Sequence, residues 1–276
     1  MRILKVLIPS LLLLLIFSSC NKYNKVFKSK DTAYKLKVAD ELFAKKKYKV
    51  AQQLYEELFA AVKGTTVFED VYYKDAYCYY GMKQYREAES LFKGFLETFP
   101  NSPRAEEVDY LHAYCFYKQS PKVELEQVNT AKAIGMMQTF INTHPGSARI
   151  KEATEIIDKS RAKLELKEFR GAELYYNLGQ YRAAAIAFGV LINNYPESQK
   201  GDEYKLKAVR SYYRFAKLSI PEKQIERFEK VVTEFEDFVD RYPESKLLKD
   251  AESYKNLSLN HIKEIKNEQT QTSVKR

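Results

Sequence analysis

The side chains that could carry chemistry are few in this sequence, and their spacing assembles no catalytic centre. The histidines are scattered, at His112, His144 and His261. Cys78 and Cys115 form no Cys-x-x-Cys pair and have no histidine pair at the spacing of a zinc site. The sequence also lacks a glycine-rich phosphate loop, a Gly-x-Ser-x-Gly elbow and a His-Glu-x-x-His helix. We therefore expect no enzyme activity, no metal and no cofactor.

Cys20 is the residue whose surroundings predict a covalent modification. Residues 1–19 carry two positive charges, an apolar run and then small residues, which is the pattern of a secretory signal peptide. The apolar run Leu11–Phe17 is much shorter than the roughly 20 residues that a membrane-spanning helix needs. Its end, Phe17-Ser18-Ser19-Cys20, resembles a bacterial lipobox, in which the cysteine carries acyl chains such as palmitate. We expect an anchored mature chain beginning at Cys20, the alternative being an incidental thiol beside an ordinary cleavage site.

Composition limits the fold and the partners. Of 276 residues, 45% are hydrophobic, which is enough for a sizeable core, while 9 Gly and 8 Pro are too few for a turn-rich all-β protein. The formal charge is +9, and loss of Arg2 and Lys5 with the signal peptide leaves 9 − 2 = +7. A basic exported protein can meet anionic lipid or acidic protein, but we expect no nucleic-acid partner. Asn21 after the cysteine matches many lipoproteins of the outer membrane, facing the periplasm.

An internal repeat dominates the sequence. An apolar stripe with helical spacing recurs and in most copies ends at a proline, whose ring cannot continue a helix. Its five copies cover residues 48–59, 85–100, 133–145, 181–196 and 228–243. Two residues after each of the four prolines stands a serine, which can accept a hydrogen bond from the first N–H groups of the next helix. These serines are Ser102, Ser147, Ser198 and Ser245.

Each copy is preceded by another helix with a small residue where the two helices must approach closely: Ala39, Ala76, Ala113, Ala172 and Ala208. We expect an all-α chain, an α-solenoid of five tetratricopeptide-like helix pairs and a C-terminal capping helix. Wider spacing in copies three and five predicts insertions in their inter-helix turns, and 147–177 reads as one long helix. The predicted segments are a signal peptide at 1–19, a lipidated linker at 20–30, repeats and cap at 31–266, and a polar tail at 267–276.

The combination of motifs resembles one family in particular. A lipobox cysteine is followed by Tyr23-Asn-Lys-Val26-Phe27, then by five repeats, with the string Ala172-Glu173-Leu174-Tyr175-Tyr176 in the fourth. This is similar to the BamD family, outer-membrane lipoproteins of the β-barrel assembly machinery. The resemblance implies a scaffold that binds unfolded outer-membrane proteins and docks a BamA-like barrel protein. The Asn-Arg pair of that family's fourth repeat is Ile186-Ala187 here, so contacts at that point are not carried over.

A stripe of tyrosines predicts where a peptide would bind. On the helix surface, the tyrosines are offset from the residues that face each pair's own core. The offset is toward the concave side, where the first helices of successive pairs line up. An aromatic trough with hydroxyl rims suits an extended apolar segment, whereas the alternative is that half of the rings only pack one repeat on the next. The predicted groove residues are Phe43, Tyr73, Tyr77, Tyr80, Tyr110, Tyr114 and Tyr117.

Other readings remain open at this point. A periplasmic tetratricopeptide lipoprotein that organises cell-wall or division factors would share everything except the fourth-repeat string. A hydrolase hidden in the insertions and a solute-binding lipoprotein are disfavoured by the repeat pattern. Cys78 and Cys115 occupy equivalent sites one repeat apart, and we expect both to be buried free thiols, with a disulfide as the alternative.

Overall fold

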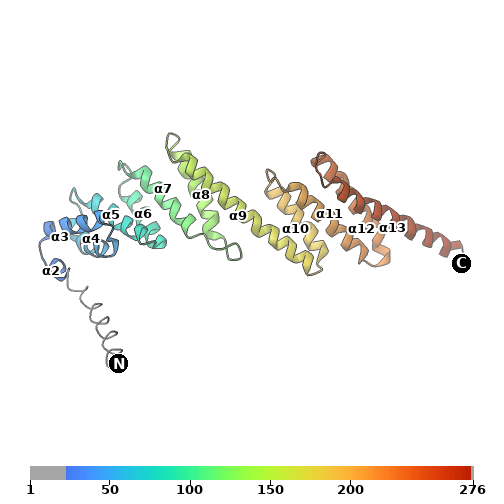
Figure 1. The fold of residues 1–276 in the computed structure, drawn as a ribbon, viewed down its shortest axis with the longest axis horizontal. Coiled ribbons are helices and arrows are strands. Elements are labelled where there is room, and N and C mark those ends of the chain that lie inside the picture. The colour runs from blue at the N-terminus through green and yellow to red at the C-terminus, as the bar shows by residue number, and fades with distance from the viewer. Residues whose placement is uncertain (1–22, 275–276) are drawn as a thin grey trace, which may run out of the picture. The chain divides into compact units, whose positions relative to one another are not determined.

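The computed structural model describes residues 23–274, and within them every regular element is a helix (Figure 1). The predicted signal peptide and Cys20 lie outside the described residues. The helices are α2 (Asn24–Phe27), α3 (Thr32–Ala44), α4 (Tyr48–Val62), α5 (Phe68–Gly81), α6 (Tyr85–Thr98), α7 (Ala105–Lys118), α8 (Val128–Thr143), α9 (Ile150–Asn177), α10 (Tyr181–Asn194), α11 (Gly201–Lys217), α12 (Pro221–Arg241) and α13 (Leu248–Val274).

The helices pair as the sequence predicts. The pairs are α3 with α4, α5 with α6, α7 with α8, α9 with α10 and α11 with α12, and α13 packs on the last pair. The predicted class, an α-solenoid of five helix pairs with a capping helix, is confirmed. The long helix predicted at 147–177 is α9, which spans 28 residues.

The chain divides into two compact units, and the division falls within α9. The first, here unit 1, ends at Ser160, and unit 2 begins at Arg161. In unit 1, one core runs from α5 to the start of α9, where Ala153 and Ile156 are buried. In unit 2, Ala184 and Phe188 are fully buried in a core shared by α9, α10 and α11.

Small residues permit the close approach within pairs. Ala76 and Ala113, on the first helices of pairs two and three, are completely buried, and so is Ala88 on the facing helix α6. A larger side chain at these positions would separate the helix backbones, because protein interiors are packed about as densely as organic crystals. The alanine spacing in the sequence therefore marks the positions where the two helices of a pair contact each other.

The four serines that follow the prolines form the same double hydrogen bond. In the best example, Ser102 Oγ accepts from the backbone N–H of Arg104 at 3.0 Å and donates to the Glu69 carboxylate at 2.6 Å. The equivalent acceptors of the other three serines are Glu106, Glu165 and Asp202. In each case the N–H belongs to the residue directly before the first residue of the next helix. Each serine therefore connects the turn before that helix to the first helix of the previous pair.

Of the two expected insertions between paired helices, the one in copy five is wrong and the one in copy three is present. The extra residues of copy five do not enlarge the turn: α11 ends at Lys217 and α12 begins at Pro221, so they lengthen both helices instead. Proline is well tolerated at the first position of a helix, and this one starts α12 early. The insertion of copy three does form a loop, 119–127, in which the buried Gln127 donates to the Lys122 and Leu125 carbonyls.

The last helix also continues beyond the expected end near Lys266. It reaches Val274, because no glycine or proline interrupts residues 248–274 and many of them are good helix formers. No helix between residues 23 and 274 combines the length and the apolar character needed to cross a bilayer.

Candidate functional site

All seven residues of the predicted groove lie in unit 1, and their rings form one continuous line of contacts. The line joins the first helices of three successive pairs: the Phe43 and Tyr77 centroids are 5.7 Å apart, and those of Tyr80 and Tyr114 are 6.2 Å apart. Neighbouring rings within α5 and within α7 are 5.6 to 5.8 Å apart. We call this set the aromatic line: Phe43, Tyr73, Tyr77, Tyr80, Tyr110, Tyr114 and Tyr117.

The aromatic line is half-buried except at one residue. Tyr110 is only 2% exposed and stacks on Tyr114, so it is part of the packing between α7 and α8. The other six side chains keep an exposed portion. Burial raises the pKa of the Tyr73 and Tyr80 hydroxyls above the ordinary tyrosine value, so both stay neutral and can donate hydrogen bonds.

Two arginines, which the sequence reasoning missed, lie over the line. Arg104 stands 4.7 Å from the ring centre of Tyr73, and Arg149 stands 4.5 Å from that of Tyr110. Each arginine comes four residues after the proline that ends a helix, at Pro100 and at Pro145. This repeated Pro-x-Ser-x-Arg spacing is the signal that could have found them.

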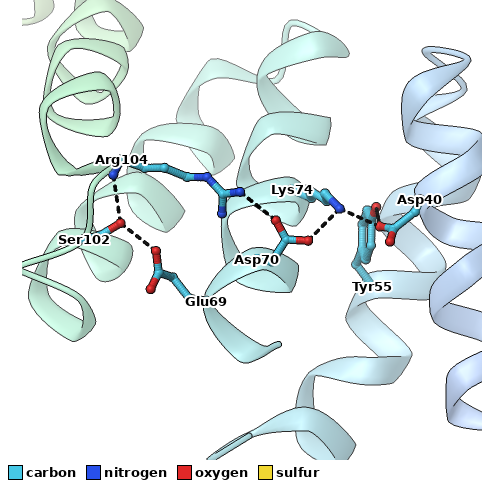
Figure 2. A network of polar contacts seen from close by, with 7 residues as sticks. All are labelled: Asp40, Tyr55, Glu69, Asp70, Lys74, Ser102 and Arg104. Carbon is cyan, nitrogen blue, oxygen red and sulfur yellow. Dashed lines mark hydrogen bonds and ion pairs between the residues drawn. The ribbon is translucent and has the colours of Figure 1, made fainter. Parts of the chain in front are cut away.

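A polar network fixes one of these arginines (Figure 2). Arg104 Nη2 donates to Asp70 Oδ1 at 2.8 Å, and Lys74 bridges Asp70 and Asp40 at 2.6 and 2.8 Å. Tyr55, buried on α4, donates its hydroxyl to the same Asp40 at 2.7 Å. These carboxylates are partly exposed, so each ion pair contributes at most about 1 kcal/mol, and their main effect is to hold Arg104 in position.

Some equivalent positions of unit 2 are also aromatic, whereas others, such as Glu173 and Val209, are not. The aromatic ones are covered by cations. Lys207 lies 5.5 Å from the ring centre of Phe169 and pairs with Glu173 at 3.0 Å. Arg210 lies 4.9 Å from the ring centre of Tyr176, and Arg214 covers Tyr181. Cations therefore lie over rings in both units, and at these equivalent positions it is unit 1 that has rings in contact with one another from pair to pair.

The two thiols are free and buried, as predicted. Burial raises the pKa of Cys115 to about 12 and that of Cys78 further, so neither is a thiolate at neutral pH. His112 Nε2 contacts Glu89 at 2.9 Å, while its buried Nδ1 has no hydrogen-bond partner in the described chain, and His144 Nε2 contacts Asp109 at 3.0 Å. Among the described residues, no group of three or more His, Cys, Asp or Glu is placed to hold a metal ion.

The chain is similar to several solved structures and to one protein family. Among solved structures, the chain is similar to the TPR2AB domain of yeast Sti1 in its pHSP90 complex, with 13% identity, 82% of this chain and 98% of that chain covered, and a TM-score of 0.38. It is also similar to the human IFIT1 dimer with PPP-AAAA, with 14% identity, 82% and 57% covered, and a TM-score of 0.28. No curated protein matches the sequence significantly. The YfiO family model, described as "Outer membrane lipoprotein", matches residues 28–225, and the chain therefore belongs to this BamD family of outer membrane lipoproteins.

Proposed function

We propose that this lipoprotein is a scaffold of β-barrel assembly, which binds unfolded outer-membrane proteins and docks a BamA-like barrel protein. The aromatic line carries the proposal. Six partly exposed rings, spread over three helix pairs, offer a long contact surface for an extended apolar segment at small entropy cost. Neutral hydroxyls along the line can bond to the backbone of such a segment. Family membership supports the outer-membrane location, facing the periplasm, where the substrates would be met.

The experiment replaces Tyr77 and Tyr114 together with alanine and measures binding of a peptide copied from the aromatic-rich C-terminal strand of an outer-membrane protein. Each lost anchor should cost on the order of 1 to 2 kcal/mol of binding free energy. Both rings also pack between repeats, so thermal unfolding is followed beside binding. The control replaces Tyr34 and Tyr175, which are 39% and 43% exposed and lie outside the aromatic line.

Weakened peptide binding on an intact fold, with the control variant unchanged, supports the proposal. Unchanged affinity with unchanged unfolding removes these tyrosines from the site, and a collapsed melting temperature shows that they are core. Co-purification from detergent-solubilised envelope tests the partner. Recovery of a large β-barrel protein supports assembly, whereas recovery of cell-wall enzymes favours the alternative scaffold role.

A further inference from the structure

A cluster of lysines surrounds the start of the described chain. One of its lysines lies in α2, three lie in the turn between α3 and α4, and one lies in the first turn of α4. We call this set the lysine patch: Lys25, Lys45, Lys46, Lys47 and Lys49. All five side chains belong to exposed residues, and within residues 23–274 none forms an ion pair with a carboxylate. Four other described lysines of unit 1 are paired with carboxylates, as Lys35 is with Glu57 and Lys74 is with Asp70. The patch therefore presents positive charge that the protein itself does not neutralise.

The N-terminal segment is fixed beside this turn. Val26 is 6% exposed and belongs to the core of the first helix pair, and Tyr23 and Phe27 pack against the same core. Lys47 Nζ donates to the Tyr23 hydroxyl at 3.4 Å, which ties the turn to the residue where the described chain begins. The lysine patch and Tyr23 thus occupy one corner of unit 1.

Covalent geometry connects this corner to the expected anchor. Tyr23 follows Cys20 by three residues, which span at most about 10 Å even when fully extended. If Cys20 carries acyl chains, as the proposed function requires, the patch lies close to the headgroups of the same membrane. Charges at that distance act across about one Debye length, roughly 8 Å at physiological salt.

We propose that the lysine patch docks on anionic phospholipid headgroups and orients unit 1 on the membrane that holds the lipid anchor. Lysine suits this role because its compact charge sits on a long apolar stem, which can lie along the surface while the ammonium meets phosphate. A basic patch beside an acyl chain is also a second membrane signal in addition to the first. Each lysine near an anionic surface strengthens binding by about fivefold.

The test uses the mature chain with Cys20→Ala, so that binding does not depend on acylation. Flotation compares vesicles of phosphatidylethanolamine containing one quarter phosphatidylglycerol with vesicles of neutral phosphatidylcholine. We expect binding to the anionic vesicles that falls with added salt. The variant with Lys45, Lys46, Lys47 and Lys49 all changed to Gln should bind about 600-fold more weakly. The matched control changes four exposed lysines of unit 2 to Gln: Lys200, Lys217, Lys246 and Lys249.

The outcomes separate the patch from general charge and from the anchor. A control variant that loses as much binding as the patch variant would show that net charge alone acts, and absent binding to anionic vesicles would overturn the docking. A patch that instead captures a soluble acidic protein from the envelope, with no vesicle binding, would also overturn it. Palmitate labelling of Cys20 in cells is followed separately: no label removes the premise, whereas a labelled chain without vesicle binding leaves the proposed function standing and refutes only the patch.

Discussion

The two units place aromatic residues at equivalent repeat positions but cover them differently. In unit 1 the rings contact one another from pair to pair, as Tyr80 does with Tyr114. In unit 2 the ring of Tyr176, which is equivalent to Tyr80, lies under Arg210. Two adjacent positions after the core alanine differ: Tyr114 and Cys115 in α7 correspond to Val209 and Arg210 in α11.

The same helix-pair repeat therefore forms two different aromatic surfaces, one in each unit. In α7, Tyr114 supplies the ring that contacts Tyr80 while Cys115 is buried in the core, whereas Val209 offers no ring at the equivalent position of α11. A long cation reaches over the ring of the previous pair and replaces the aromatic contact by a cation–π contact, worth about 0.5 to 1 kcal/mol when exposed. Unit 1 therefore offers a line of contacting rings with arginines over two of them, and unit 2 offers rings at the equivalent positions that lie under cations.

The largest expected effect comes from exchanging these residues. Cys115→Arg should lower the free energy of unfolding by about 3 to 5 kcal/mol, because the guanidinium would enter a fully buried site. The reverse change, Arg210→Cys, should cost about 1 kcal/mol or less, since Arg210 is exposed. Urea denaturation of both full-length variants measures the pair. Equal costs would show that the Cys115 site has room and solvation for a cation, and that the contrast between units is not built at this position.

A second test uses the residue just before the core alanine, which is Asp75 in α5 and Lys207 in α11. Asp75 is 5% exposed, and one of its carboxylate oxygens, Oδ1, has no hydrogen-bond partner in the described chain. Burial, with a smaller contribution from the charge of Glu56, raises the pKa of Asp75 to about 7. Lys207, by contrast, is satisfied by its pair with Glu173.

The sign of the pH effect follows from proton binding. Between about pH 4 and pH 7 the unfolded chain has this carboxyl ionised while the folded chain keeps it protonated, so its contribution to stability falls as pH rises. Asp75→Asn removes that loss. The variant should gain stability over the original chain by about 4 kcal/mol as the pH goes from 4 to 8, measured by urea denaturation at each pH. A stability difference that stays constant with pH would show that Asp75 is ionised throughout.

The smallest effect concerns the turns that join the helices of a pair. Lys83 in unit 1 and Gly179 in unit 2 occupy the same turn position, with φ of 63° and 75°. In both, the following N–H bonds to a carbonyl five residues back, which closes the helix end in the left-handed conformation that favours glycine. Lys83→Gly should stabilise the fold by about 0.5 to 1 kcal/mol, and Gly179→Lys should destabilise it by a similar amount. A shift of the thermal midpoint in the same direction for both variants would contradict this account.

Sequence reasoning found most of the fold because its signals are local. The apolar stripe of period 3.6, the proline stops and the alanine contacts predict the five helix pairs, the long helix α9 and the start of three second helices at tyrosine. It failed where a single residue sets a boundary: Pro221 starts α12 early, and nothing stops α13 at Lys266. Such errors concern how far a helix extends, not whether it exists.

The candidate site was predicted as a set but not in its details. Helical spacing alone placed the tyrosines of α5 and α7 on one face, and the repeat length aligned them with Phe43. Whether a ring would be open or buried depended on side chains from other pairs, since Tyr110 is enclosed by Phe140 and covered by Arg149. The sequence by itself determined the periodic elements and the register of the aromatic residues, because both follow from local geometry. Only the tertiary structure decided which rings are covered, by what and how deeply, because the covering side chains come from neighbouring pairs and meet the rings only after packing.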